Sequence, residues 1–308
     1  MENNFAVRTE GLTKKYGDKI AVNSVDLTIP RGVAFGYLGP NGAGKTTLIR
    51  MLLGLTPSTS GQMWMLGEKV PEHRSLALAK VGAIVEEPRF HEYMTALENL
   101  RIAAAVRGPE AEKRIGESLE RVGLGERSKD KVKSYSLGMR QRLGIARCLL
   151  TDPELLILDE PMNGLDPAGI MEFRLLIRAF VGEGRTVVIS SHLLDEIEKT
   201  CDAVSIVDQG QIIRQGNLSE MFGNPSGEVE IEVGDSEGAL SVLSRLSYVS
   251  SVELVGKNQL KFELNPEVKP SQVNSDLVLA GVLVEKFSPT RKTLEDEFLS
   301  ITSNMGIH

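Results

Sequence analysis

The chain has 308 residues, of which 41% are hydrophobic, and this length and composition favour two folded domains. Its 42 acidic residues outnumber its 35 basic ones, and the net charge of −7 argues against nucleic-acid binding, which depends mostly on cationic contacts to phosphates. No stretch approaches the roughly 18 uncharged apolar residues of a membrane helix, which argues against a membrane-spanning chain.

The first 55 residues predict strands, a loop and a helix. Residues 7–29 carry alternating β-branched residues around a turn at Gly17-Asp18, which is typical of paired strands. Residues 33–38 form an unbroken apolar run, as expected for a short buried strand. A glycine-rich loop comes next, and a helix follows over residues 47–55.

Residues 90–135 predict a helical insertion. Thr95 and Glu98 form the Ser/Thr-x-x-Glu pattern of a capping box, which predicts a helix that starts there. Gly108-Pro109 ends this helix, and a second helix is expected over residues 110–122. The insertion interrupts what is otherwise an α/β pattern.

Strands and helices alternate again after residue 135. Ser136 is a good N-cap for a helix over residues 137–150, and an apolar strand follows at 155–158. Asp166 and Pro167 supply the N-cap and first position of the next helix. A strand at 186–189, a helix near His192 and two strands around residues 209–210 complete the pattern, which predicts a mainly parallel sheet wrapped by helices.

The last part of the chain predicts a separate small domain. Residues 224–227, Asn-Pro-Ser-Gly, read as a linker between a domain at 1–224 and another at 228–308. The second domain follows a βαββαβ order, which suits a ferredoxin-like α+β fold. A final helix is expected to start at Thr293.

The glycine-rich loop has the pattern G-x-x-x-x-G-K-[ST], which indicates a site for nucleotide phosphates. Its glycines turn backbone N–H groups inward and let phosphate oxygens approach. The helix that follows directs the positive end of its dipole at the same point. Lys45 supplies a charge for the β- and γ-phosphates, and the Thr46 hydroxyl can ligate Mg²⁺. The loop residues are Gly39, Pro40, Asn41, Gly42, Ala43, Gly44, Lys45 and Thr46.

Two carboxylates follow the apolar strand at residues 155–158. Paired with a phosphate loop, Asp159 is expected to hold Mg²⁺ and Glu160 to act as the general base that polarises the attacking water. His192 also follows a strand, at the edge of a parallel sheet where ligands bind, and its imidazole can hydrogen-bond the γ-phosphate. The helix N-terminus at Ser136 and Gly138 is a second place for an anion, although that segment taken alone favours an ordinary capped helix.

Taken together and in this order, the motifs resemble those of the ATP-binding-cassette (ABC) ATPases over residues 5–222. The resemblance implies a P-loop NTPase core with an antiparallel β subdomain and a helical subdomain at about 90–135. It implies that Tyr16 stacks on adenine, that Thr47 completes the Walker A loop, and that Ser136 and Gly138 belong to the signature motif. Asp166 matches the D-loop and His192 the switch histidine.

The family resemblance also implies partners. Two cassettes bind head to tail, so that each ATP lies between the phosphate loop of one copy and the signature helix of the other. The chain departs from the family pattern where the family has a glutamine, because Glu86 occupies that position. A carboxylate there can ligate Mg²⁺ but brings negative charge near the γ-phosphate. With the Tyr-Ser-Leu-Gly-Met signature, Glu86 is similar to the bacitracin-resistance and lantibiotic-immunity branch.

Three functions are compatible with these motifs. The first is the ATPase subunit of an exporter, with antibiotic resistance as its expected role, bound to a separate integral membrane permease. The second is a soluble cassette ATPase acting on ribosomes or chromosomes, which the single cassette and the acidic charge disfavour. The third is a regulatory nucleotide-binding module without turnover, which the presence of both Lys45 and Glu160 argues against.

The expected cofactors are ATP and Mg²⁺, and the expected location is the cytoplasmic face of the plasma membrane, reached through the permease alone. Cys148 and Cys201 lie in apolar surroundings without a CxxC spacing, so they predict buried, reduced thiols, as in a cytosolic protein. No apolar run follows Met1, so no signal peptide is expected.

Overall fold

The computed structural model of the chain describes residues 4–222, 228–265, 268–289 and 294–295. Contacts between residues divide the chain into two units, Met1–Gly216 and Asn217–His308. The linker predicted at residues 224–227 lies outside the described residues, as does the final helix predicted from Thr293, except for two helical residues, Leu294 and Glu295.

A six-stranded sheet forms the centre of the first unit, with the order β11-β10-β4-β9-β8-β7. The five strands from β10 to β7 pair in parallel. Every residue of β4, β8 and β9 is buried, as expected for strands covered on both faces. The strands are β4 (Ala34–Leu38), β7 (Val81–Ile84), β8 (Leu155–Asp159), β9 (Thr186–Ser191), β10 (Ala203–Asp208) and β11 (Gln211–Asn217).

An antiparallel sheet with the order β2-β1-β5-β6 packs beside the first, and β3 pairs with β1. Helix α1 (Lys45–Leu52) lies between the two sheets, and its apolar face enters a core to which both contribute. The phosphate loop is therefore anchored to both sheets. The antiparallel strands are β1 (Phe5–Tyr16), β2 (Lys19–Val25), β3 (Thr28–Pro30), β5 (Ser60–Met65) and β6 (Glu68–Val70).

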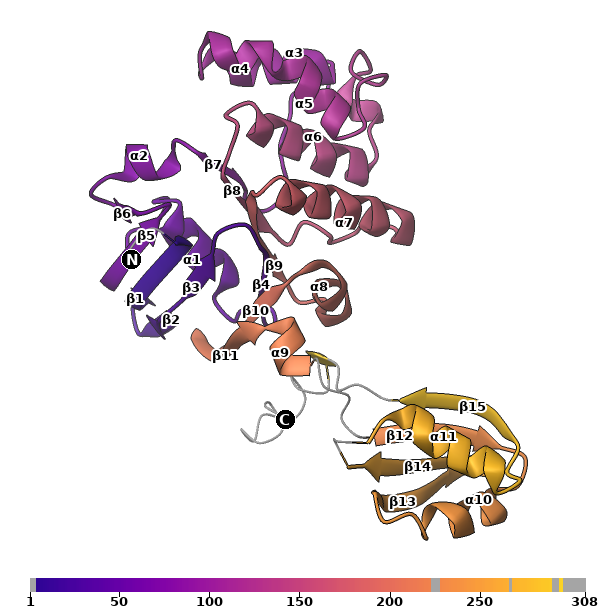
Figure 1. The fold of residues 1–308 in the computed structure, drawn as a ribbon. Coiled ribbons are helices and arrows are strands. Elements are labelled where there is room, and N and C mark those ends of the chain that lie inside the picture. The colour runs from indigo at the N-terminus through magenta and orange to yellow at the C-terminus, as the bar shows by residue number, and fades with distance from the viewer. Residues whose placement is uncertain (1–3, 223–227, 266–267, 290–293, 296–308) are drawn as a thin grey trace. The chain divides into compact units, whose positions relative to one another are not determined.

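Helices α3 to α5 form a group at one end of the first unit, beyond α6 (Figure 1). The predicted capping box at Thr95 and Glu98 is confirmed, and so are the N-caps Ser136 and Asp166. The other helices of this unit are α2 (Arg74–Leu78), α3 (Ala96–Ala105), α4 (Pro109–Lys113), α5 (Ile115–Arg121), the 3-10 turn η1 (Val132–Ser134), α6 (Leu137–Leu149), α7 (Pro167–Gly182) and α8 (Leu194–Thr200).

The prediction of one helix over residues 110–122 is wrong, because this segment forms α4 and α5. The two helices meet at Arg114, whose N–H bonds the carbonyl of Ala111, three residues back, and α5 then restarts with Ser118 bonding to the Arg114 carbonyl. Ala111 and Ile115, on either side of this interruption, are both buried. The helix predicted near His192 likewise begins two residues later, at Leu194.

The second unit has its own core and an antiparallel sheet with the order β13-β14-β12-β15. From β12 onward its elements follow the predicted βαββαβ order, and α9, which precedes them, was not predicted. The elements are α9 (Leu218–Phe222), β12 (Glu228–Val233), α10 (Ser236–Leu243), β13 (Val249–Gly256), β14 (Gln259–Leu264), α11 (Pro270–Leu279) and β15 (Val284–Pro289). None of the helices in the described parts of the chain is long and apolar enough to cross a membrane.

The register of the parallel sheet brings four strand ends to one edge. Leu38 at the end of β4 pairs with Ser191, Ser190 pairs with Asp159, and Leu158 pairs with Ile84. The segments that follow these strands therefore begin side by side at the carboxyl edge, where ligands of open α/β sheets bind. These segments begin at Gly39, Val85, Glu160 and His192.

Candidate functional site

The phosphate loop joins β4 to α1, and its backbone conformation depends on glycine. Gly44 is the N-cap of α1 with φ of 97°, in the left-handed region that favours glycine. A Cβ atom at Gly44 would lie 2.2 Å from the carbonyl oxygen of Ala21 in β2. A side chain at this position would therefore push the loop away from the antiparallel sheet, and any larger residue should distort the loop.

Lys45 lies at the centre of the site. It is only 6% exposed, and its Nζ donates to the carbonyl oxygens of Gly39 (2.6 Å) and Pro40 (3.1 Å). The same Nζ lies 3.1 Å from Oε1 of Glu160. The other carboxylate oxygen of Glu160 lies 3.0 Å from Nδ1 of His192. Three residues predicted from separate motifs thus form one connected chain of charged and polar groups.

Ser190 holds two of the predicted carboxylate residues in place, although no role was predicted for it. Its hydroxyl donates to Asp159 Oδ1 at 2.5 Å and accepts from the backbone N–H of Glu160 at 3.0 Å. Glu160 has φ of 48°, which is uncommon for a residue other than glycine. The sequence did offer one signal for Ser190, which is a polar residue at the end of a buried apolar strand. Buried polar side chains are nearly always hydrogen-bonded, so a partner could have been expected.

A cavity of about 330 Å³ opens at the phosphate loop. Most of its lining comes from predicted ATP-binding residues, with Lys19 and Ala21 added. The lining residues are Tyr16, Lys19, Ala21, Asn41, Gly42, Gly44, Lys45, Thr46, Thr47 and Glu160. Tyr16 is half-exposed, with the Lys14 ammonium 4.8 Å from its ring centroid. The exposed ring at the mouth of the cavity is available to stack on a planar base. Ala43, by contrast, is buried.

A second cavity, of about 340 Å³, contains Ser136, Gly138 and Asp166. Ser136 caps α6 by accepting a hydrogen bond from the Met139 N–H, and Asp166 caps α7 by accepting from the Gly169 N–H. The two cavities have no lining residue in common. Within one chain, the signature residues therefore do not line the cavity that contains Lys45.

The residues present fit a magnesium ion that is completed by nucleotide phosphates. Asp159 is 3% exposed, and its hydrogen-bond partner is the neutral Ser190 hydroxyl, so this bond leaves its charge unneutralised. Thr46 lines the adjacent cavity. Among the described residues, no group of three or more His, Cys, Asp and Glu side chains could hold a metal by itself. Mg²⁺ characteristically needs only one or two protein ligands beside phosphates.

Glu86 does not join the chain of Lys45, Glu160 and His192. Its Oε1 lies 2.5 Å from Arg50 Nη2, and its side chain is 64% exposed. Its φ is 61°, again in the left-handed region. The expectation that Glu86 faces the magnesium held by Thr46 and Asp159 therefore stays a prediction.

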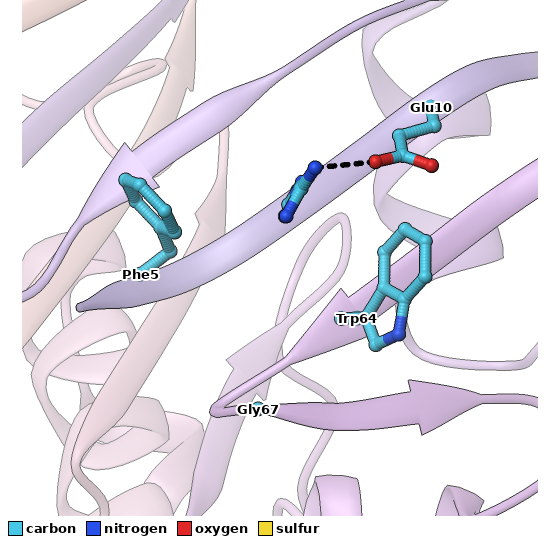
Figure 2. A pocket seen from close by; sticks show the side chains of 5 residues that line it. Phe5, Glu10, Trp64 and Gly67 are labelled. Carbon is cyan, nitrogen blue, oxygen red and sulfur yellow. Dashed lines mark hydrogen bonds and ion pairs between the residues drawn. The ribbon is translucent and has the colours of Figure 1, made fainter. Parts of the chain in front are cut away.

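A further hollow, of about 290 Å³, lies on the antiparallel sheet (Figure 2). Phe5, Trp64 and Gly67 line it with Arg8 and Glu10, which form an ion pair at 2.5 Å. Arg8 also lies over the Trp64 ring, so its charge already has partners. Phe5 begins β1, whereas Tyr16 ends it, which places this hollow and the phosphate-loop cavity at opposite ends of the strand.

Comparison with known proteins gives a consistent result. A family profile described as ABC transporter matches residues 22–163. A bacitracin transport ATP-binding protein of Enterococcus faecalis is 36% identical over 304 residues, which is 98% of each chain. A lantibiotic transport ATP-binding protein of Streptococcus pyogenes is 42% identical over 224 residues, covering 71% of this chain and 96% of that protein.

Solved structures give the same fold for the first unit. The cbiO1 protein of Clostridium perfringens, part of an ABC transporter complex, matches with a TM-score of 0.66 at 28% identity, covering 79% of this chain and 96% of that one. A dimeric ATP-binding cassette in a post-hydrolysis state, bound to ADP and phosphate, matches with a TM-score of 0.61 at 26% identity, covering 69% and 98%.

Proposed function

Because this chain belongs to the ABC transporter family as an ATP-binding, ATP-hydrolysing subunit, we propose that it powers export of a peptide antibiotic through a separate membrane permease. The observation that carries the ATPase assignment is the connected chain of Lys45, Glu160 and His192 beside the phosphate loop. The names of the bacitracin and lantibiotic relatives support the substrate class.

The residues of this chain divide the work of phosphoryl transfer. Backbone N–H groups of the loop and the N-terminus of α1 bind the phosphates, and Lys45 turns from the carbonyls of Gly39 and Pro40 to the phosphate oxygens. Tyr16 stacks on adenine. Thr46 and Asp159 would hold Mg²⁺, which when bound would neutralise charge on the phosphates. Glu86 is a further candidate ligand for this ion.

Glu160 accepts the proton of the attacking water, and His192 orients its carboxylate. Once Lys45 bonds to phosphate, Oε1 of Glu160 loses its cationic partner and becomes available to the water. His192 stays within hydrogen-bonding distance of Oε2, which fixes the direction in which the other oxygen points. The phosphate loop and the base thus act in sequence.

The complete site requires a second copy of the chain. Ser136 and Gly138 line a cavity separate from that of Lys45, which supports a head-to-tail dimer in which the N-terminus of α6 meets the nucleotide of the other copy. Asp166, in the same cavity, lies beside that junction. On this proposal, the chain associates with the cytoplasmic face of the membrane through the permease alone. It has no nucleic-acid partner.

Replacement of Glu160 by glutamine tests the ATPase assignment. We expect ATP binding to persist, hydrolysis to fall by about 10²–10⁴-fold, and an ATP-bound dimer to accumulate, because the amide keeps the shape but not the basicity. Glu154→Gln is the matched control, since Glu154 immediately precedes β8 where Glu160 immediately follows it. A Glu160→Gln protein that turns over like the parent would refute the base assignment.

The permease is tested by purification from membranes of the source cells. A membrane protein should be retained with the chain in detergent, and the pair should raise resistance to a peptide antibiotic unless Glu160 is replaced. Full ATPase activity in a chain that captures no membrane protein would contradict the transport role and leave the ATPase assignment intact.

A further inference from the structure

Arg50 and Thr46 lie one turn apart on the same face of α1. Residues at positions i and i+4 of a helix have Cβ atoms about 5–6 Å apart, and helical side chains lean toward the N-terminus. Arg50 is in the last turn of α1, so its side chain extends back toward the end that carries the phosphate loop. The Glu86 carboxylate that pairs with Arg50 therefore lies toward the phosphate-loop end of α1.

The sheet brings Glu86 to the same edge from the other side. Ile84 at the end of β7 pairs with Leu158, so Glu86 and Glu160 each follow a paired residue by two positions. Glu86 therefore follows β7 at the same edge of the sheet that carries Asp159 and Glu160. A free carboxylate that approaches the phosphates at this edge would repel ATP, because like charges a few ångströms apart interact appreciably even in water.

We propose that Arg50 is a positioning residue for Glu86, which it holds away from the nucleotide phosphates. The 2.5 Å ion pair neutralises the extra negative charge of a glutamate at this position. Glu86 has φ of 61°, in the left-handed region that is uncommon for a residue with a side chain. Both side chains are substantially exposed, at 42% and 64%, so the pair is weak enough to open during the reaction cycle.

The inference rests on the proposed function and extends it to a residue outside the phosphate-loop motif. It predicts that Arg50 acts through Glu86 and not by direct contact with ATP. Removing Arg50 frees the carboxylate to approach the phosphates. Removing the charge of Glu86 at the same time should abolish that penalty, because a neutral amide repels nothing.

The test is a double-mutant cycle of Arg50→Gln and Glu86→Gln on the full chain, with ATP affinity measured by equilibrium dialysis in EDTA. In EDTA no Mg²⁺ is present to mask the repulsion between the Glu86 carboxylate and the phosphates of ATP. We expect Arg50→Gln to weaken ATP binding by about three- to tenfold, and this loss to disappear in the Glu86→Gln background. Arg50→Lys, which keeps the charge, should bind nearly as well as the parent. The loss should shrink in high salt, which screens the charges.

Arg178→Gln is the matched control, because Arg178 forms an exposed 2.5 Å pair with Asp202 and should leave ATP affinity unchanged. Equal losses from Arg50→Gln in both Glu86 backgrounds would overturn the inference, since Arg50 would then act on the nucleotide itself. No loss in either background would overturn it too, because the pair would be remote from the phosphates. A parent protein that binds no ATP even with Mg²⁺ present would instead refute the proposed function.

Discussion

Replacing Ser190 with alanine should destabilise the first unit and slow ATP hydrolysis, because one hydroxyl holds two residues of the site. It donates to the Asp159 carboxylate and accepts from the Glu160 N–H, and Ser190 itself is fully buried. Alanine leaves Asp159 buried without its donor. It also loosens Glu160, although the carbonyl of Ser190 still accepts from the Glu160 N–H at 3.1 Å.

The expected loss of stability in Ser190→Ala depends on the charge of Asp159, which accepts the Ser190 hydrogen bond. A hydrogen bond to a charged group contributes about 1.5–3 kcal/mol to the free energy of unfolding, against about 0.5–1.5 kcal/mol for a neutral pair. Ser205 offers the neutral comparison, since it is equally buried and donates to the side-chain oxygen of Gln215 at 2.8 Å. Ser190→Ala should therefore cost more than Ser205→Ala and also lower hydrolysis by at least about tenfold.

The assay is urea unfolding followed by tryptophan fluorescence. The chain has one tryptophan, Trp64, and it lies in β5 of the first unit, so the transition reports that unit without the second. ATPase rates are measured on the same samples. Equal losses of stability in Ser190→Ala and Ser205→Ala, together with hydrolysis at the parent rate in Ser190→Ala, would refute this account of the sheet edge.

Two other predictions concern the dimer and pH. Lys45→Ala and Ser136→Ala chains should each be inactive alone, but an equal mixture should recover about a quarter of the parent activity, because half the dimers are mixed and each has one intact site; no recovery would exclude a site shared between copies. The Arg185 side chain lowers the pKa of Asp152 below 3.8 by donating a hydrogen bond to it. Asp152→Asn should therefore lower the urea midpoint above pH 3.8, and the difference from the parent should vanish as pH falls through the lowered pKa; a difference that grows in acid would contradict this.

Patterns that span only a few residues predicted the secondary structure most reliably. Short-range rules placed the capping box at Thr95 and the N-caps at Ser136 and Asp166, because each depends on contacts within three residues. The apolar runs of β4 and β8 gave buried strands, since strands covered on both faces cannot alternate. These elements were enough to predict which loops reach the carboxyl edge.

Contacts between distant segments were not predictable in the same way. The pair of Arg50 and Glu86 joins residues on α1 and after β7, and no local pattern links them. The role of Ser190 depends on the register of β9 against β8, which the sequence leaves open. The break at Arg114 was missed because residues 110–122 have one continuous helical pattern, and the N–H of Arg114 bonds the Ala111 carbonyl three residues back without a local signal that marks it.

On the proposed function, charge predicts that two copies associate only around ATP. Each copy has a net charge of −7, so two copies repel in the absence of a shared ligand. The phosphates supply one, because they are bound by the loop before α1 in one copy and by the N-terminus of α6 in the other. Hydrolysis cleaves that shared anion and allows repulsion to separate the copies. Glu160→Gln leaves the anion intact, which is why it should trap the dimer.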